Sequence, residues 1–321
     1  MKIQSINKSH ITIKQQNYRG KSMRTPLLIE QHFHGAYGVD FNKSNADEIA
    51  KLANKLKAIG IGGFFPTLVT DSIDNLKRQI SEIKKAAKNC REILGIHLEG
   101  VFLNPEKKGI HNEEHFLELT PQNYQKLEDD FIKIVTLAPE LDNGLIDYLK
   151  KSDIKVQAGH CIGWAKNSNQ LDGVTHTFNA MSRISHKEEP STALNALIDD
   201  NVYTEVIADG VHVSDKALKL LFKNKPEDKV ILISDALPIT YSDIKDYIFA
   251  DSLIHYDGER ATSATGTLAG STKLLPEIVK IIGKKGMFNP KYIENTYKYH
   301  NIEPRGELEW DEEFNITKVT E

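Results

Sequence analysis

The chain has 321 residues, of which 40% are hydrophobic and 27% are charged. This balance is typical of a globular protein and argues against disorder. Acidic residues outnumber basic residues by 45 to 41, so the charge gives no sign of binding to nucleic acid or membranes. Two cysteines are too few for a disulfide framework or a thiolate zinc site, and the first ten residues lack the apolar core of a signal peptide. We therefore expect a cytoplasmic protein with no nucleic-acid or membrane partner.

Short apolar runs alternate along the chain with longer amphipathic segments. In the first of these segments Ile49, Leu52 and Leu56 share one helical face, and Asn45 is the expected N-cap. Residues 71–88 and 214–223 show the same spacing. The apolar runs cover residues 26–35, 60–70, 92–100, 131–139, 154–161, 173–180, 202–210 and 229–236.

Eight alternations, with runs apolar enough for burial on both faces, predict a (β/α)8 barrel. A doubly wound open sheet is the alternative, but it would concentrate its polar signals near one glycine-rich turn. Here nearly every run ends in a reactive side chain. We expect the barrel to span residues 25–303. Residues 1–24 and 304–321, which alternate as strands do, are expected to form a small, shortened β subdomain.

Histidines and a carboxylate occupy equivalent positions at the ends of these runs. His32 and His34 are two residues apart, so on a strand they point to the same face. Glu99 ends the third run, His160 lies at the end of the fifth, and His176 lies on the sixth. Because the strand ends of a barrel converge on one mouth, these side chains could surround one or two divalent ions such as Zn²⁺ or Fe²⁺.

Each of these residues taken alone has a structural explanation. A single histidine in an apolar run is more often a hydrogen-bonded core residue than a ligand, and Glu99 could be a turn residue. Asp235, at the end of the eighth run, could cap the next segment or touch a water at the ion. Five candidate ligands at equivalent positions are hard to explain by chance. His97 also faces inward in this pattern, and we assign it no role; Cys161 is expected to be a buried spectator.

Longer motifs resemble one enzyme family. HLEGVFLNPEKKGIH (97–111), THTFNAM (175–181), IADGVHV (207–213), SDA (234–236) and GTLAGS (266–271) occur in the order typical of N-acetylglucosamine-6-phosphate deacetylases, which are metal-dependent amidohydrolases. The similarity covers about residues 26–285. It implies hydrolysis of the N-acetyl group of N-acetylglucosamine 6-phosphate to glucosamine 6-phosphate and acetate.

The resemblance also implies roles for matching residues. It makes Glu99, His160 and His176 the principal metal ligands, and His32 and His34 allow a second ion. Asp235 matches the catalytic acid and base, and His111 matches a residue that polarises the acetamide carbonyl. The substrate-binding matches are His212, Asn179, Ala180 and Lys187.

This chain departs from the family pattern at two of these motifs. Val101 stands where the family has proline after Glu-Gly. Relatives supply an arginine to the phosphate from the neighbouring subunit of a homodimer; here the segment offers Arg183 and Lys187, and Lys187 is nearer the expected spacing. Lysine binds phosphate as a point charge, without the two-pronged geometry of arginine.

Two other functions remain open from the sequence. The ligand set alone also fits another amidohydrolase reaction, such as cyclic amide hydrolysis or nucleobase deamination. A non-catalytic sugar-phosphate sensor is the second alternative, although a sensor would not need the proton shuttle that Asp235 offers. The motifs THTFNAM and ADGVHV favour the amino sugar phosphate.

Overall fold

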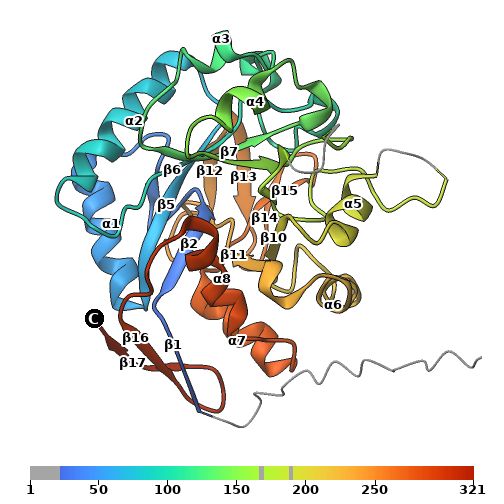
Figure 1. The fold of residues 1–321 in the computed structure, drawn as a ribbon. Coiled ribbons are helices and arrows are strands. Elements are labelled where there is room, and N and C mark those ends of the chain that lie inside the picture. The colour runs from blue at the N-terminus through green and yellow to red at the C-terminus, as the bar shows by residue number, and fades with distance from the viewer. Residues whose placement is uncertain (1–21, 166–169, 188–190) are drawn as a thin grey trace, which may run out of the picture.

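The computed structural model describes residues 22–165, 170–187 and 191–321. Its centre is a parallel sheet of eight strands in the order β11-β10-β9-β8-β7-β6-β5-β2. Two backbone hydrogen bonds join the ends of the sheet, from Asp235 N–H to the His32 carbonyl (2.9 Å) and from His34 N–H to the Ala236 carbonyl (2.8 Å), which closes a barrel (Figure 1). The strands are β2 (Leu28–Phe33), β5 (Ile61–Val69), β6 (Ile96–Glu99), β7 (Ile132–Leu137), β8 (Lys155–Ala158), β9 (Gly173–Val174), β10 (Tyr203–Ile207) and β11 (Val230–Ile233).

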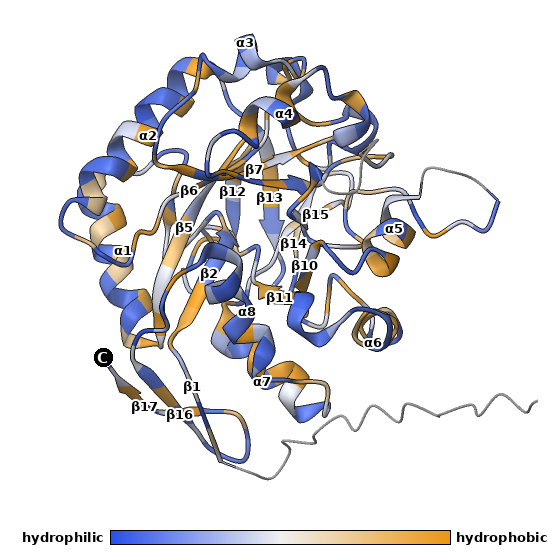
Figure 2. Cartoon of the chain, viewed as in Figure 1, coloured by the Kyte–Doolittle hydropathy of each residue, from blue (hydrophilic) through white to orange (hydrophobic). Residues whose placement is uncertain are grey.

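Each of these strands lies inside one of the eight apolar runs, so the predicted (β/α)8 barrel is confirmed. The strands are almost entirely buried, and Figure 2 shows helices whose hydrophilic residues gather on one side. This pattern is what a parallel sheet covered by amphipathic helices requires.

Four of the described helices, α1, α2, α3 and α6, begin at a residue whose side chain caps the first turn. Asn45 precedes α1 and accepts hydrogen bonds from the backbone of Asp47 and Glu48, and Ser214 caps α6. The buried face of α1 includes Ile49 and Leu56, as the spacing predicts. The helices are α1 (Ala46–Ala58), α2 (Ile73–Ala87), α3 (Pro121–Tyr124), α4 (Leu145–Leu149), α5 (Thr192–Ile198), α6 (Asp215–Asn224), α7 (Leu275–Lys284) and α8 (Lys291–His300), with short 3-10 turns at Pro105–Lys107, Glu113–His115, Pro139–Leu141 and Glu227–Lys229. No helix in the described ranges has both the length and the apolar character needed to cross a membrane.

An antiparallel sheet follows β11 and was not predicted. Its strands are β12 (Asp246–Phe249), β13 (Ser252–Tyr256), β14 (Ala261–Ser263) and β15 (Leu268–Gly270), and they pair in that order. A two-stranded hairpin, β3 (Gly35–Ala36) with β4 (Val39–Asp40), follows β2. Both insertions follow the carboxyl ends of barrel strands, the side of a barrel on which active sites are built.

The end segments of the chain meet in a third sheet. β1 (Met23–Thr25) pairs with β16 (Glu307–Trp310), which pairs with β17 (Ile316–Thr320). This sheet agrees with the β appendage expected from the termini, although residues 1–21 of that expectation lie outside the described residues. The division into a barrel at residues 25–303 and a β subdomain from 1–24 and 304–321 stays a prediction.

Candidate metal centre and active site

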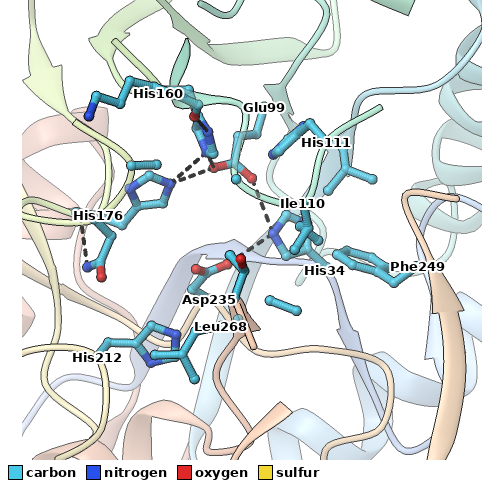
Figure 3. Close-up of a pocket in the computed structure, with 18 of the residues that line it drawn as sticks. His34, Glu99, Ile110, His111, His160, His176, His212, Asp235, Phe249 and Leu268 are labelled. Atoms are coloured by element: carbon cyan, nitrogen blue, oxygen red, sulfur yellow. Dashed lines mark hydrogen bonds and ion pairs between the residues drawn. The ribbon is translucent and has the colours of Figure 1, made fainter. Parts of the chain in front are cut away.

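Six of the sequence candidates converge at the carboxyl ends of the barrel strands (Figure 3). All six are buried, with at most 8% of the residue exposed. They come from β2 and the residue after it (His32, His34), from the end of β6 (Glu99), and from positions two residues beyond β8, β9 and β11 (His160, His176, Asp235). All but His32 line a cavity of about 480 Å³.

Glu99 stands between two groups of donors. Its Oε1 atom lies 2.9 Å from His176 Nε2 and 3.3 Å from His160 Nε2, and these two nitrogens are 3.1 Å apart. Its Oε2 atom lies 3.2 Å from the Nε2 atoms of both His32 and His34. The two carboxylate oxygens therefore face different pairs of histidines, and one side chain can serve two cation positions.

Asp235 completes the group around His32 and His34. Its Oδ1 atom is 3.0 Å from His34 Nε2 and 3.5 Å from His32 Nε2. Burial raises the pKa of Asp235, but the positive charge of His32 and the hydrogen bond with His34 outweigh burial and lower it below its usual value. The carboxylate is therefore ionised at neutral pH and can accept a proton.

The hydrogen bonds of the rings show that these residues fit divalent ions. The Nδ1 atoms of three rings face neighbouring oxygens as donors: His32 to Glu205 (3.0 Å), His34 to the Thr67 carbonyl (3.2 Å) and His160 to the Lys107 carbonyl (2.8 Å). The Nδ1 atom of His176 is buried and has no hydrogen-bond partner among the described residues. Each Nε2 atom then points into the cluster, and the buried Nε2 of His32 has no hydrogen-bond partner among the described residues. Metal-binding histidines characteristically donate through one nitrogen and bind through the other.

The backbone turns sharply where several of these residues follow their strands. The φ angles are +48° at His160, +30° at His176 and +52° at Asp235, in the left-handed region. Such a conformation costs about 1–3 kcal/mol for a residue other than glycine, and it persists only where the surroundings fix it. The turns direct all three side chains into the cavity (Figure 3).

His111 faces the same cavity from the loop after β6. Its Nδ1 atom lies 2.9 Å from the Thr70 hydroxyl, and its ring packs edge-on against His160, with centroids 4.5 Å apart. Burial holds the pKa of His111 well below its usual value, and the neighbouring His160 lowers it further, so the ring is neutral. If Thr70 donates to Nδ1, the proton of His111 resides on Nε2, where it can donate to a bound carbonyl oxygen.

The expected sugar-phosphate contacts lie on the opposite wall. His212 is held by Asp209, whose Oδ2 atom lies 2.8 Å from His212 Nδ1 and whose Oδ1 atom accepts the backbone N–H of His212. Asn179 and Ala180 line the cavity in the turn after β9, where the Asn179 amide donates to the His176 carbonyl (3.1 Å). Three of the four predicted substrate residues are therefore brought together.

The antiparallel sheet that follows β11 supplies another wall. Phe249 and Leu268 line the cavity, and the Phe249 ring lies 5.1 Å from the ring of His34 (Figure 3). These residues cover the histidines with an apolar surface, which lowers the local dielectric and strengthens electrostatic interactions inside the cavity.

Comparison with known proteins gives the context for this geometry. No family model matches the chain. It is 34% identical over 270 residues to N-acetylglucosamine-6-phosphate deacetylase of Bacillus subtilis, covering 78% of this chain and 67% of that protein. It is 30% identical to N-acetylgalactosamine-6-phosphate deacetylase of Escherichia coli O157:H7, covering 79% of this chain and 70% of that protein. This chain belongs to the N-acetylglucosamine-6-phosphate deacetylase family.

Solved structures of the family have the same fold. The deacetylase of Thermotoga maritima superimposes with a TM-score of 0.82 at 25% identity, covering 93% of this chain and 87% of that chain. A mutant deacetylase of Mycobacterium smegmatis in complex with N-acetyl-D-glucosamine 6-phosphate gives a TM-score of 0.83 at 24% identity. The superposition covers 94% of this chain and 86% of that chain.

The departure from the deacetylase pattern at Val101 has a structural consequence. Val101 has a φ of +59°, and its N–H donates to the Thr70 hydroxyl oxygen (3.2 Å). Proline has φ near −65° and no N–H, so it could adopt neither feature. While accepting from Val101, the Thr70 hydroxyl keeps its own proton, which it can donate to His111 Nδ1 in the tautomer described above.

Lys187 does not reach this cavity within its own chain. It is exposed, in the segment after the Asn-Ala-Met motif, and its proposed contact from a neighbouring subunit remains a prediction. Sequence reasoning missed Lys107, which lines the cavity, and Glu205, whose carboxylate lies under the histidines. Lys107 is part of the KKGIH motif, and Glu205 faces inward on β10 with the period of two that a strand imposes.

Metal binding by this deacetylase-family chain is expected to release protons. Burial lowers the pKa of His34, but hydrogen bonds with Asp235 and Glu99 outweigh it and raise the pKa to about 9. Burial lowers the pKa of His32 as well, but the negative charges of Glu99, Glu205 and Asp235 outweigh burial and raise this pKa well above its usual value. Both rings are therefore protonated at neutral pH without metal, and a cation must displace those protons, so affinity falls as the pH drops below about 9.

Calorimetric titration of metal-free protein in two buffers of different ionisation enthalpy counts these protons. The apparent binding heat should differ between the buffers at pH 7, and the difference should shrink as the pH rises through about 9, where His34 loses its second proton. Equal heats in both buffers at pH 7 would show that the rings are already neutral.

Proposed function

We propose that this protein hydrolyses the N-acetyl group of N-acetylglucosamine 6-phosphate to acetate and glucosamine 6-phosphate. Support comes from curated relatives with that activity in their names, together with an ionised Asp235 beside a histidine and glutamate cluster in one cavity. The relative that acts on N-acetylgalactosamine 6-phosphate makes the C4 epimer a second candidate substrate.

The residues divide the work of amide hydrolysis. Glu99, His160, His176, His32 and His34 would hold one or two divalent ions, which supply Lewis acidity and lower the pKa of water. Asp235 accepts the proton of the attacking water and delivers it to the departing sugar nitrogen. His111 donates from Nε2 to the carbonyl oxygen as negative charge develops there. His212, Asn179 and Ala180 hold the sugar phosphate.

The setting of the enzyme is also part of our proposal. Imidazole and carboxylate donors suit Zn²⁺ or Fe²⁺. A homodimer would allow Lys187 of one subunit to reach the phosphate bound in the other. We propose a cytoplasmic enzyme whose partner is a small amino sugar phosphate. The net charge of −4 argues against nucleic acid or a membrane as the partner.

Acetate release tests the proposed reaction. Metal-reconstituted protein is assayed with N-acetylglucosamine 6-phosphate, its C4 epimer, plain N-acetylglucosamine and a cyclic amide such as dihydroorotate. We expect the highest kcat/KM with one of the two phosphorylated sugars. Turnover of the cyclic amide without acetate release from any sugar would make the assignment wrong.

Lys107 is the one lysine or arginine lining the cavity among the described residues, and we propose that its ammonium binds the substrate phosphate. Lys107→Met is expected to raise KM for the phosphorylated sugar by about 10–100-fold, because a hydrogen bond to a charged group contributes about 1.5–3 kcal/mol. KM for plain N-acetylglucosamine should stay unchanged, since that sugar has no phosphate.

Lys108→Met is the matched control, because Lys108 pairs with Glu113 (2.8 Å) and does not line this cavity. The backbone carbonyl of Lys107 that His160 contacts is kept in the variant. An equal change of KM for both sugars would argue against a phosphate contact.

A further inference from the structure

A buried carboxylate lies beneath the histidine cluster, inside the barrel. Glu205 on β10 is 1% exposed, and three N–H donors surround it. Gln31 Nε2 donates to its Oε1 atom (2.6 Å), while His32 Nδ1 (3.0 Å) and the backbone N–H of His176 (3.3 Å) both meet its Oε2 atom. Two of these donors belong to β2 and one to the turn after β9. His32 of β2 faces Glu99 Oε2, and His176 of the turn faces Glu99 Oε1.

We propose that Glu205 is the positioning residue of the metal centre: it fixes the orientation and tautomer of His32 and ties that ring to the backbone of His176. The inference rests on the metal site of the proposed function. By accepting the Nδ1 proton of His32, Glu205 leaves the Nε2 atom as the ligand, 3.2 Å from Glu99 Oε2. A carboxylate in this position also increases the basicity of the ring toward a cation.

The geometry requires two accepting oxygens, which only a carboxylate provides. A glutamine at position 205 would accept from either His32 or Gln31 and would turn an NH₂ group toward the other donor. Gln31 is itself held in place, because its Oε1 atom lies 3.0 Å from His300 Nε2 and its backbone carbonyl 3.1 Å from His97 Nδ1. His97 therefore belongs to the same hydrogen-bond network. It contacts the backbone of β2 and has no role as a metal ligand in this proposal.

Glu30 is a second buried carboxylate of this barrel, but it is not surrounded by three N–H donors as Glu205 is. Glu30 lies on β2 and is fully buried, but its Oε1 atom accepts one bond, from the Ser234 N–H (3.0 Å), and its Oε2 atom has no partner among the described residues. A glutamine at position 30 keeps that single bond. Glu30→Gln is therefore a matched control for Glu205→Gln.

Zinc titration against a chromophoric chelator tests the proposal on metal-free wild type, Glu205→Gln, Glu30→Gln and His32→Gln. We expect Glu205→Gln to weaken one ion by about 10–100-fold, the loss typical when a hydrogen-bond partner of a metal ligand is removed. The ion affected should be the one that His32→Gln abolishes, and the other ion and the Glu30→Gln variant should keep wild-type affinity.

A second measurement needs no variant at position 205. Histidine-selective ¹⁵N NMR of zinc-loaded wild type, with His32→Gln to assign the resonance, reports which nitrogen of His32 carries the proton. A protonated Nδ1 that exchanges slowly with solvent supports the role of Glu205.

The remaining outcomes separate this inference from the function itself. Zinc bound equally well by wild type and Glu205→Gln, equal weakening of both ions in both glutamate variants, or a proton on His32 Nε2 would each overturn the positioning role while leaving the metal site intact. Wild type that binds no zinc would overturn the metal site as well. If Glu205→Gln does not fold, the tautomer measurement on wild type decides.

Discussion

Asp235→Asn is expected to lower kcat for acetate release by about 10²–10⁴-fold, the contribution typical of a general acid and base, or about 3–5 kcal/mol of barrier. Asparagine has nearly the shape of aspartate and tolerates the positive φ of this position, so the turn after β11 should persist. It cannot accept a proton from water, and no other ionised carboxylate of the cluster is free, because Glu99 lies between the histidine pairs.

Steady-state kinetics with metal analysis checks this result. The ion that His160 and His176 would hold should be retained, since Asp235 contacts neither ring among the interactions described above. Asp246→Asn, an exposed aspartate on β12, provides the control and should keep wild-type kcat. If Asp235→Asn retained more than about a tenth of the wild-type kcat, a smaller effect than general acid and base catalysis gives, the proton shuttle would have to be another group.

Glu99→Gln is expected to remove metal as well as activity. The amide has one acceptor oxygen, and its NH₂ group would face one pair of histidines without being able to bind a cation. We expect at least one ion per chain to be lost. The rate should fall by about 10³-fold or more, because Lewis-acid stabilisation contributes several kcal/mol.

Elemental analysis of purified protein and acetate release measured on the same sample test this prediction. Glu106→Gln is the control, because Glu106 lines the same cavity outside the ligand cluster. A Glu99→Gln protein with wild-type zinc content would show that Glu99 does not ligate the ions. If the Glu99→Gln protein kept its full zinc content but lost activity, Glu99 would act in the chemical step and not in metal binding.

Much of the fold followed from hydrophobic pattern. All eight apolar runs contain a barrel strand because strands buried on both faces must be apolar throughout, and this pattern is local in the sequence. The ligands were also predictable, since the strand ends of a barrel share one mouth and a histidine or glutamate there stands out against apolar neighbours.

Features that depend on tertiary contacts were not predictable. The sheet of β12–β15 uses short strands with mixed exposure, so its residues lack a clear alternation. In the sequence, Lys107 is one lysine in a charged loop, and only the folded loop shows that its side chain lines the cavity. The side chain of Glu205 points inward from β10, but only the structure shows that its partners are Gln31 and His32, which lie 174 and 173 residues earlier in the chain.

The left-handed torsions at His160, His176 and Asp235 limit how this enzyme can be made more heat-tolerant. Glycine would relax each torsion, yet each of these positions carries a side chain that the site requires, so glycine substitution cannot be used to remove this strain. Thermostabilising changes should therefore be sought at exposed positions whose side chains do not line the cavity, for example at Ile248 and Leu253, which face each other across the β12–β13 pair and are each about half exposed.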